Sequence, residues 1–238
     1  MRNKLNKFSV VIPIFNEEKN LNLLIKKINK SLKTFKFEII LVDDDSTDNS
    51  HTILRKLRLK NSNLRFYIRR KNKDLSKSCI FGFNKAKFKN IIVMDGDLQH
   101  EPKYIPKMIK LFITNDLDFV VGTRNFKTFG IKGLNFFRFW ASKVLMNVFF
   151  VFVGKKTSDP MSGFFIFKKA IFKKNKVRLF SRGFKILSDL LYSNKKIIKV
   201  QDYKINFNLR KAGKSKMNFQ VLLNLLHFII FNFFRNLN

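Results

Sequence analysis

The stretch FEIILVDDDS, Phe37–Ser46, decides the fold that we predict for this chain. Its first part, Phe37–Val42, is almost entirely apolar and contains β-branched residues, which is typical of a strand buried on both faces of a sheet. Three aspartates follow directly. Acidic residues also follow soon after FSVVIPI, Phe8–Ile14, and directly after NIIVM, Asn90–Met94. The chain therefore repeats a buried strand whose carboxyl end carries acid.

Helical patterns separate these strands. Apolar residues recur three or four positions apart within 21–28, 53–57, 80–83 and 105–112, and LRFYI, Leu64–Ile68, adds another short strand. Repeated pairs of a buried strand and a helix form a mostly parallel sheet with helices on both faces. We therefore predict the α/β class, and the sequence contains no internal repeat or low-complexity linker.

The composition fits one sizeable α/β domain or two small ones. The chain has 238 residues, of which 45% are hydrophobic, so it can bury a real core. Lys and Arg number 49 against 16 Asp and Glu, and the net charge of +33 is spread along the whole chain. Such a surface attracts anionic lipids, nucleic acids and phosphorylated substrates, without choosing among them. The single cysteine, Cys79, excludes an internal disulfide and is compatible with a reducing cytosol.

The acidic residues are expected to meet at one edge of the sheet, because ligands of open α/β sheets bind outside the carboxyl ends of the strands. An isolated Asp-x-Asp pair is often only a solvated turn, but here three strand ends contribute acid. Asp95 and Asp97 are two residues apart in an extended segment and face the same side, and Gly96 lets a ligand approach the backbone. Oxygen ligands of this kind suit Mg²⁺ or Mn²⁺ held together with substrate phosphates.

A zinc site is not expected. The cysteine and the three histidines, His51, His100 and His227, show no ligand spacing. We interpret the histidines as surface or helix residues. The metal prediction therefore depends on the carboxylates.

Two apolar segments are candidates for contact with a membrane. The tail MNFQVLLNLLHFIIFNFF, Met217–Phe234, has about 18 residues without formal charge, near the lower limit for a spanning helix. Because it contains several amides and is flanked by basic residues, an interfacial helix over 217–238 is favoured, with a core helix and a spanning helix as alternatives. The segment 131–154 is rich in Phe, and its uncharged part is too short to span. We expect two short helices on the bilayer there, or a helical pair packed into the core.

Eight stretches of the chain resemble, in this order, the motifs of glycosyltransferase family 2, and most closely those of the branch that transfers sugars to dolichyl and polyprenyl phosphates. They are VVIPIFNEE, EIILVDDDSTDNS, DLSKSCIFGF, VMDGDLQHEP, DFVVGTRN, SDPMSGF, RGFKILSDLL and FNLRKAGKSKM. The resemblance extends from about Phe8 to Met217, nearly the whole chain. It implies the GT-A nucleotide-sugar fold, with a mostly parallel central sheet flanked by helices, and a divalent ion, Mg²⁺ or Mn²⁺.

The resemblance also implies roles for individual residues. Residues at the first two strand ends would hold the nucleoside: Pro13, Phe15, Glu17, Val42 and Asp44. The Asp-x-Asp motif would bind the metal and the diphosphate through Asp95, Asp97 and Gln99, together with Gly96. Basic residues would contact phosphates of the donor or the acceptor: Arg124, Arg210 and Lys216. Asp159 would be a base or a carboxylate that orients the acceptor, with capping of a turn as an alternative. The predicted catalytic residues are Asp97, Asp159 and Arg124.

The implied activity is that of an inverting, metal-dependent glycosyltransferase. Its donor would be a nucleotide sugar of the GDP-mannose or UDP-glucose type, and its acceptor a polyprenyl or dolichyl phosphate. We expect a catalytic domain over 1–216 that includes the membrane-facing segment 131–154, followed by the interfacial helix over 217–238. The protein would be cytoplasmic and peripheral on the inner face of the membrane, either alone or with a separate membrane protein as its partner.

Two other functions stay open from the sequence. A family 2 transferase could act on a saccharide or another soluble acceptor, and would then need Asp159 or another carboxylate as its base. A non-catalytic basic module could bind a membrane or nucleic acid. Because the sequence contains no helix-turn-helix, RNP-type or zinc pattern, we expect no nucleic-acid partner.

Several residues differ from the family pattern. Phe15 stands where tyrosine is usual, and it keeps a ring that can stack. Asp45 and Asp74 replace glycines, and aspartate tolerates a left-handed backbone better than most residues. Phe165 replaces an arginine and Asp189 a glutamate. Because the metal motif is intact, we expect an active enzyme.

Overall fold

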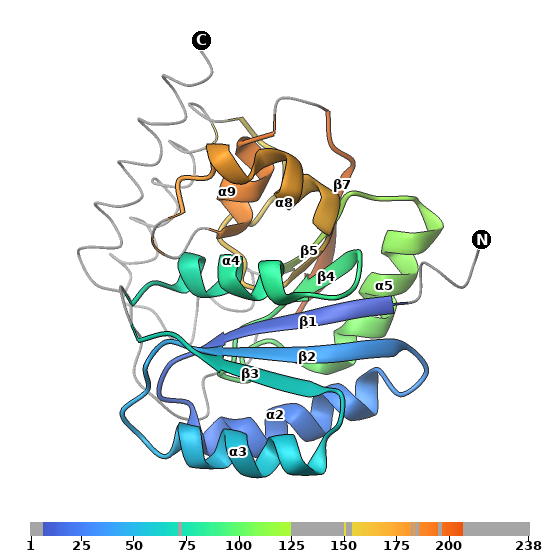
Figure 1. Cartoon of the computed structure of the whole chain (residues 1–238). Coiled ribbons are helices and arrows are strands. Elements are labelled where there is room, and N and C mark those ends of the chain that lie inside the picture. Colours follow the sequence, from blue (N-terminus) through green and yellow to red (C-terminus); the bar gives the residue numbers. More distant parts are fainter. Residues whose placement is uncertain are drawn as a thin grey trace, which may run out of the picture.

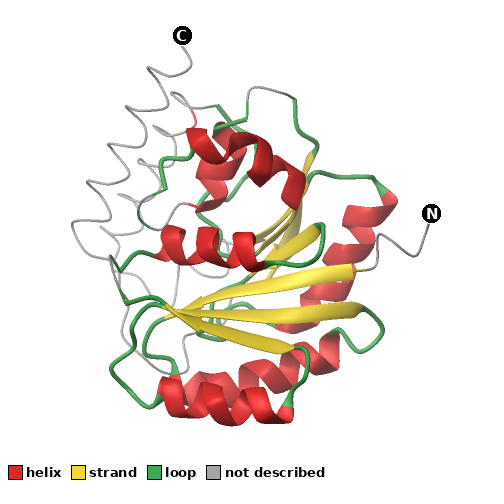
Figure 2. Ribbon diagram, in the orientation of Figure 1, coloured by secondary structure: helices red, strands yellow, loops and turns green. Residues whose placement is uncertain are grey.

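The strands in the described part of the chain form one seven-stranded sheet in the order β3-β2-β1-β4-β6-β5-β7. The computed structural model describes residues 7–70, 73–124, 150, 154–181, 183, 186–194 and 197–206. Within these residues, helices lie on both faces of the sheet, as Figure 1 and Figure 2 show. The predicted α/β class is confirmed.

Most neighbouring strands are parallel. The strands are β1 Lys7–Ile14, β2 Lys36–Asp43, β3 Leu64–Ile68, β4 Asn90–Val93, β5 Phe119–Arg124, β6 Phe165–Lys168 and β7 Val200–Ile205. β1 pairs with β2 and β4, β2 with β3, and β5 with β7, all in parallel, whereas β6 is antiparallel to β4 and β5. The carboxyl ends of β1, β2 and β4 are therefore neighbours at one edge, where the arrowheads of β1 and β2 meet on the left of Figure 1.

One face of the sheet packs against α2, α3 and α5, and the other against α4, α8 and α9. The helices are α2 Glu18–Ser31, α3 Ser50–Lys60, α4 Leu75–Lys85, α5 Ile105–Thr114, α8 Lys169–Asn175 and α9 Ile186–Tyr192, with 3₁₀ turns η1 Pro102–Tyr104 and η2 Lys176–Arg178. Each face has its own cluster of buried apolar side chains. The sheet thus separates two cores.

The apolar spacing in the sequence corresponds to the buried face of each helix. In α2 the buried apolar residues are Leu21, Leu24, Ile25 and Ile28. In α5 they are Ile105, Met108, Ile109 and Phe112. Burying one such side chain stabilises the fold by about 1.5–3 kcal/mol. These stripes hold the helices so that the loops between strand and helix lie at the acidic edge.

The strand bounds agree with the sequence prediction to within one residue for β1, β2, β3 and β4. The later strands were not predicted from the pattern, although DFVVGTRN covers all of β5. β6 reverses the direction of the sheet between β4 and β5. Repetition of βα units does not indicate such a reversal, because it depends on which strands pair.

The predicted membrane segments lie almost entirely outside the described residues. Phe150 and Gly154 are the described residues of 131–154, and 217–238 is not described. The interfacial helices and the domain boundary at 216 therefore stay predictions. In the described part of the chain, no helix combines the length and the apolar character that crossing a bilayer requires.

Candidate active site

Three acidic side chains follow the neighbouring strand ends of β1, β2 and β4. Glu17 comes after β1, Asp44 after β2 and Asp97 after β4, with relative exposures of 7%, 8% and 5%. Because β2, β1 and β4 are adjacent in the sheet, their acidic loops meet at one edge. The sequence predicted this convergence.

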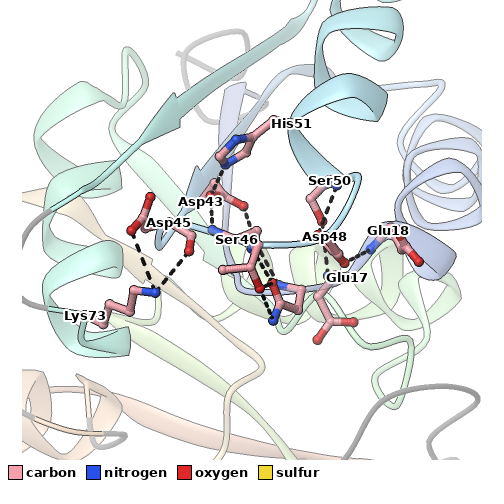
Figure 3. Close-up of polar contacts among 11 residues, drawn as sticks. Glu17, Glu18, Asp43, Asp45, Ser46, Asp48, Ser50, His51 and Lys73 are labelled. Atoms are coloured by element: carbon pink, nitrogen blue, oxygen red, sulfur yellow. Dashed lines mark hydrogen bonds and ion pairs between the residues drawn. The ribbon is translucent and has the colours of Figure 1, made fainter.

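The loops after β1 and β2 are joined by hydrogen bonds from backbone to side chain (Figure 3). The N–H of Asn16 donates to Ser46 Oγ at 2.8 Å, and the N–H of Glu17 donates to Ser50 Oγ at 3.2 Å. Asn16 has a φ of 55°, a left-handed conformation that asparagine tolerates. These bonds connect residues 30 and 33 positions apart and hold Glu17 in a defined place.

The first residue of the Asp-Asp-Asp run, Asp43, closes the turn after β2. Its buried carboxylate accepts hydrogen bonds from Ser46 N–H at 2.8 Å and from Ser46 Oγ at 2.5 Å. His51 Nε2 lies 2.8 Å from the same carboxylate, as Figure 3 shows. His51 lies in the first turn of α3, in agreement with its interpretation as a surface or helix residue.

The second residue, Asp44, is held between two segments. Arg69 Nη1 donates to its Oδ1 at 2.6 Å, and the backbone N–H of Asp74 donates to its Oδ2 at 2.6 Å. Burial raises the pKa of Asp44 above its usual 3.8, although the charge of Arg69 opposes the rise. Arg69 also donates to Ser78 Oγ at 2.6 Å, so one guanidinium connects the end of β3 to α4.

The two aspartates that replace expected glycines have different backbones. Asp45 has a φ of 63° and adopts the left-handed conformation, as predicted. Asp74 has a φ of −167°, so our expectation of a left-handed turn there is wrong. Its side chain caps α4 by accepting from Lys77 N–H at 3.1 Å, and it also accepts from Gly183 N–H at 2.6 Å. These two hydrogen bonds need a side-chain carboxylate, which explains why position 74 holds an aspartate and not a glycine.

The residues predicted to hold the nucleoside lie along this edge. Pro13 and Val42 are paired across β1 and β2. Lys73 Nζ is 4.9 Å from the ring centre of Phe15 and 3.7 Å from Asp45 Oδ2, and Figure 3 shows the contact between the lysine and the aspartate. A cation over an aromatic face is an attractive contact, so Lys73 helps to orient the Phe15 ring.

The Asp-x-Asp motif begins two residues after β4, and Gly96 and Asp97 lie in a turn, so our expectation of an extended segment there is wrong. Asp97 Oδ1 accepts the N–H of Gln99 at 3.1 Å, so Asp97 and Gln99 belong to one tight turn. At Gly96 a Cβ atom would come within 2.8 Å of Ile14 Cγ2 and 3.6 Å of Glu17 Cγ. The glycine therefore lets the motif lie directly against the end of β1.

The first aspartate of the motif, Asp95, lies against Gly163 and His100. A Cβ atom at Gly163 would lie 2.2 Å from Asp95 Oδ2, so the space at position 163 fits a glycine. His100 Nδ1 is 3.4 Å from Asp95 Oδ2, and its buried ring lies against Phe164 with ring centres 5.4 Å apart. Burial lowers the pKa of His100 to about 4, so the imidazole is neutral at pH 7. Our interpretation of His100 as a surface or helix residue is wrong.

The donor atoms at this edge fit a hard divalent cation. Asp95 and Asp97 offer carboxylate oxygens, and Gln99 offers an amide oxygen. Among the described residues, no group of three or more His, Cys, Asp or Glu side chains forms a metal site by itself. Mg²⁺ and Mn²⁺ accept one or two carboxylates when phosphate or water oxygens complete the shell. The residues fit an ion that is shared with a phosphorylated substrate.

Arg124 and Asp159 form an ion pair at the end of β5. Arg124 Nε donates to Asp159 Oδ2 at 2.7 Å, and Nη2 donates to Oδ1 at 2.8 Å. Asp159 is fully buried, whereas the Arg124 side chain is 25% exposed. Burial lowers the pKa of Arg124, but the hydrogen bonds and charge of Asp159, with a contribution from Asp95, outweigh it, so the pKa is raised. The guanidinium is therefore charged and fixed in orientation.

Sequence reasoning missed several residues at this edge. His100 and Gly163 stand inside the motifs VMDGDLQHEP and SDPMSGF, so a signal for them was present. The position of Arg69 depends on the pairing of β3 with β2, which no local pattern reveals. The other predicted phosphate contacts, Arg210 and Lys216, lie outside the described residues.

The mostly parallel sheet, with helices on both faces and acid at one edge, has the architecture of the GT-A fold. The family described as glycosyl transferase family 2 matches residues 9–176, more than half of the chain. The chain belongs to glycosyl transferase family 2.

Three curated relatives are similar over nearly the whole chain, and each is named dolichol-phosphate mannosyltransferase. The Pyrococcus furiosus protein is 36% identical over 225 residues, which cover 94% of this chain and 62% of that protein. The Mycosarcoma maydis protein is 31% identical over 233 residues, covering 93% and 77%, and the Saccharomyces cerevisiae protein is 30% identical over 230 residues, covering 92% and 84%. The chain thus spans less than two thirds of the length of the archaeal relative. The resemblance to the dolichyl-phosphate branch is confirmed.

Solved structures share the fold at low sequence identity. Glucosyl-3-phosphoglycerate synthase from Mycobacterium tuberculosis in complex with phosphoglyceric acid has a TM-score of 0.71 at 17% identity, covering 93% of this chain and 79% of that chain. The same enzyme in complex with Mn²⁺, uridine-diphosphate-glucose and phosphoglyceric acid has a TM-score of 0.70 at 16% identity, covering 94% and 80%. At a sequence identity this low, the similarity shows a shared fold alone.

Proposed function

We propose that this protein transfers a sugar from a nucleotide diphosphate donor to a polyprenyl phosphate. The observation that carries the proposal is the identity of 36%, 31% and 30% to three dolichol-phosphate mannosyltransferases over more than nine tenths of the chain. The names of these relatives favour mannose over glucose as the sugar, and the motifs favour GDP as its carrier. The acidic edge supports the same activity, since the carboxylates of Asp95 and Asp97 could hold a cation and the charge of Asp95 acts on the fixed Arg124.

The donor nucleoside binds where β1 and β2 end. Pro13 and Val42 form the floor, and the ring of Phe15 stacks on the nucleoside. Glu17 and Asp44 accept hydrogen bonds from its hydroxyl or N–H groups. Asp44 suits this task because Arg69 and the Asp74 N–H hold its carboxylate in place.

The donor diphosphate binds at the Asp-x-Asp motif. Asp95, Asp97 and Gln99 would hold a divalent cation jointly with the phosphates. When bound, the ion would supply Lewis-acid neutralisation of the charge on the departing nucleoside diphosphate. Gly163 and His100 support Asp95 from the protein side by direct contact.

The acceptor phosphate requires cations more than a base. The second pKa of a phosphate monoester is about 6, so the lipid phosphate is largely dianionic at neutral pH. Arg124 binds this phosphate, with Arg210 and Lys216 as further contacts. Both oxygens of Asp159 accept hydrogen bonds from Arg124, so we assign Asp159 to orienting Arg124 and not to proton abstraction. The phosphate oxygen attacks the anomeric carbon opposite the leaving diphosphate, which inverts that centre.

The acceptor places the reaction at a membrane surface. We propose that 131–154 and 217–238 lie on the inner, cytoplasmic face, with or without a separate membrane protein, and the net charge of +33 favours anionic headgroups. Flotation of the purified protein with vesicles tests this. We expect it to float with anionic vesicles and not with neutral ones, and equal partition would contradict the proposal.

The activity itself is tested with purified protein, Mn²⁺ or Mg²⁺, a short-chain polyprenyl phosphate and a panel of nucleotide sugars. We expect a glycolipid product from GDP-mannose, detected by mass spectrometry, and no product after a chelator removes the metal. If no donor yields a glycolipid, the proposal is wrong. Transfer to a saccharide or a soluble phosphate in place of the lipid would support the alternative acceptor class.

The metal assignment is tested with Asp97→Ala. Loss of a direct ligand should lower activity by more than the roughly 10–100-fold that loss of a supporting residue costs. Asp116→Asn is the matched control, because Asp116 precedes β5 at the opposite end from Arg124 and its side chain is 78% exposed. Full activity in Asp97→Ala would contradict the metal site.

A further inference from the structure

A short segment before β6 connects Arg124 to the metal motif. It is Thr157–Phe164, TSDPMSGF, called here the TSDPMSGF segment. In its middle Asp159 holds Arg124 through two hydrogen bonds, and near its end Gly163 lies against the Asp95 carboxylate. The positions of both charged groups therefore depend on how this segment is held.

Asp202 in β7 holds the start of the segment. Its Oδ1 accepts from Thr157 Oγ1 at 2.5 Å, and its Oδ2 accepts from Ser158 N–H at 2.8 Å and from Ser158 Oγ at 2.6 Å. Thr157 Oγ1 in turn accepts the N–H of Asp159 at 3.3 Å. One carboxylate thus fixes the two residues that precede Asp159.

The sheet places Asp202 for this task. β7 lies beside β5, as Figure 1 shows, and Asp202 pairs with Val121 in the strand that ends in Arg124. Two adjacent strands therefore carry the two ends of one chain of contacts, from Asp202 through Thr157 and Asp159 to Arg124. Hydrogen bonds to a carboxylate are stronger than those between neutral groups, so this chain of contacts is well ordered.

The far end of the segment is fixed independently of Asp202. Ser162 Oγ donates to the carbonyl of Gly122 at 2.6 Å, and Gly122 N–H donates to the carbonyl of Phe164 at 2.8 Å. A change at Asp202 should therefore alter the region of Asp159 and leave Gly163 and the metal motif in place.

We propose that Asp202 is a positioning residue for the transfer reaction: it orients Asp159 and, through Asp159, sets the direction of the Arg124 guanidinium toward the acceptor phosphate. This inference rests on the proposed function of Arg124. Asp202 lies between the last two motifs of the sequence, RGFKILSDLL and FNLRKAGKSKM, and belongs to neither. Its role follows from contacts 44 and 45 residues apart.

Asp202→Asn is the main test. Asparagine keeps the size of the side chain but replaces one acceptor oxygen by a donor and removes the charge. We expect kcat/KM for the short-chain polyprenyl phosphate to fall roughly tenfold, with the KM for the nucleotide sugar and the Mn²⁺ requirement unchanged. Wild-type values of kcat/KM in Asp202→Asn would overturn the inference.

Asp118→Asn is the matched control. Asp118 Oδ2 accepts the N–H of Lys199 at 3.1 Å and so connects β5 to β7 at the opposite end of both strands. We expect wild-type kinetics for this variant. If the two variants lower kcat/KM alike, Asp202 supports only the pairing of the strands, and the inference is wrong.

A double-mutant cycle identifies the route of the effect. Lysine at position 124 cannot form the two-pronged pair with Asp159, so in an Arg124→Lys background the change Asp202→Asn should cost less than about twofold. A full tenfold further loss would show that Asp202 acts by another route. The Arg124 Nε–H resonance, assigned by its loss in Arg124→Lys, should shift in Asp202→Asn and not in Asp118→Asn.

If circular dichroism shows that Asp202→Asn does not fold, a second variant, Thr157→Val, tests the inference. Thr157→Val removes the hydroxyl between Asp202 and the Asp159 N–H and keeps the volume. We expect the same pattern of kinetic change, and normal kinetics would overturn the inference. The wild type is measured first, so failure of the proposed function appears as absence of glycolipid there, while failure of this inference appears as wild-type behaviour of the variants.

Discussion

Two aspartate–arginine pairs lie on either side of the metal motif, and they differ in which partner is covered. In the pair of Asp44 and Arg69 the side chains are covered alike, at 11% and 12% exposed. In the pair of Asp159 and Arg124 the aspartate is fully covered and the arginine is 25% exposed. The first pair belongs to the β2–β3 side of the sheet and the second to the β5–β6 side.

The difference indicates what each pair holds in position. Asp44 meets one nitrogen of Arg69 and a backbone N–H, so under the proposed function this pair positions a hydrogen-bond acceptor for the nucleoside. Asp159 uses both oxygens on Arg124, so under the proposed function this pair positions a guanidinium for the acceptor phosphate. The two pairs contain the same residue types, but the arginine is the more exposed partner only in the pair of Asp159 and Arg124.

Among these substitutions, Arg124→Ala should cause the largest loss of stability. It leaves the Asp159 carboxylate buried without its main partner, which costs about 3–5 kcal/mol in the free energy of unfolding. Arg69→Ala should cost less, about 1–3 kcal/mol, because Asp44 keeps the 2.6 Å bond from the Asp74 N–H, whereas in Arg124→Ala Asp159 would keep only the 3.3 Å bond from the N–H of residue 124. Urea unfolding measures both, and equal losses would contradict the distinction. Arg124→Lys, which retains a charge, should lose less stability than Arg124→Ala.

His100, beside the second pair, should make stability fall on acidification. Its pKa is about 4 in the folded protein and 6.5 in the unfolded chain, so between these values the unfolded chain binds the extra proton. The free energy of unfolding should therefore fall by up to about 3 kcal/mol as the pH drops from 6.5 to 4. His100→Phe keeps a ring against Phe164 and should remove this slope in chelator-treated protein. Parallel pH curves for variant and wild type would refute the effect.

Gly163→Ala should displace the Asp95 carboxylate, which holds the metal under the proposed function. The added methyl would collide with Asp95, so we expect a loss of about 1–3 kcal/mol in stability and roughly tenfold weaker Mn²⁺ binding, measured by electron paramagnetic resonance. Gly122→Ala is the control, because its methyl would meet the Phe164 ring at 2.9 Å and not the metal motif. Equal Mn²⁺ affinities in the two variants would argue against the contact with Asp95.

The smallest losses of stability are expected for substitutions of Asp74 and Asp45, the two aspartates near Asp44. Asp74→Gly removes the cap of α4 and the bond to Gly183, and should cost about 1–2 kcal/mol. Asp45→Gly relieves a left-handed backbone and loses an exposed ion pair, so its effect should stay below about 1 kcal/mol. Thermal unfolding measures both. An equal cost at the two positions would contradict their different roles.

Much of the fold could be predicted because burial on a strand or a helix follows a local period. The runs at β1, β2, β3 and β4 and the stripes on α2 and α5 were readable in this way. The direction of β6 was not, since it depends on its pairing with β4 and β5. The same limit explains Asp74, whose extended backbone follows from capping α4 and binding Gly183, 109 residues away.

At the site, the sequence predicts that acid gathers at one sheet edge, because parallel strands end together and each of three ends carries its own carboxylate. The partner of each carboxylate depends on the tertiary structure. Asp44 meets Arg69 across 25 residues, Asp159 meets Arg124 across 35, and Asp202 meets Thr157 across 45. Such pairs form only when the sheet has brought their strands together, so no local period in the sequence can reveal them.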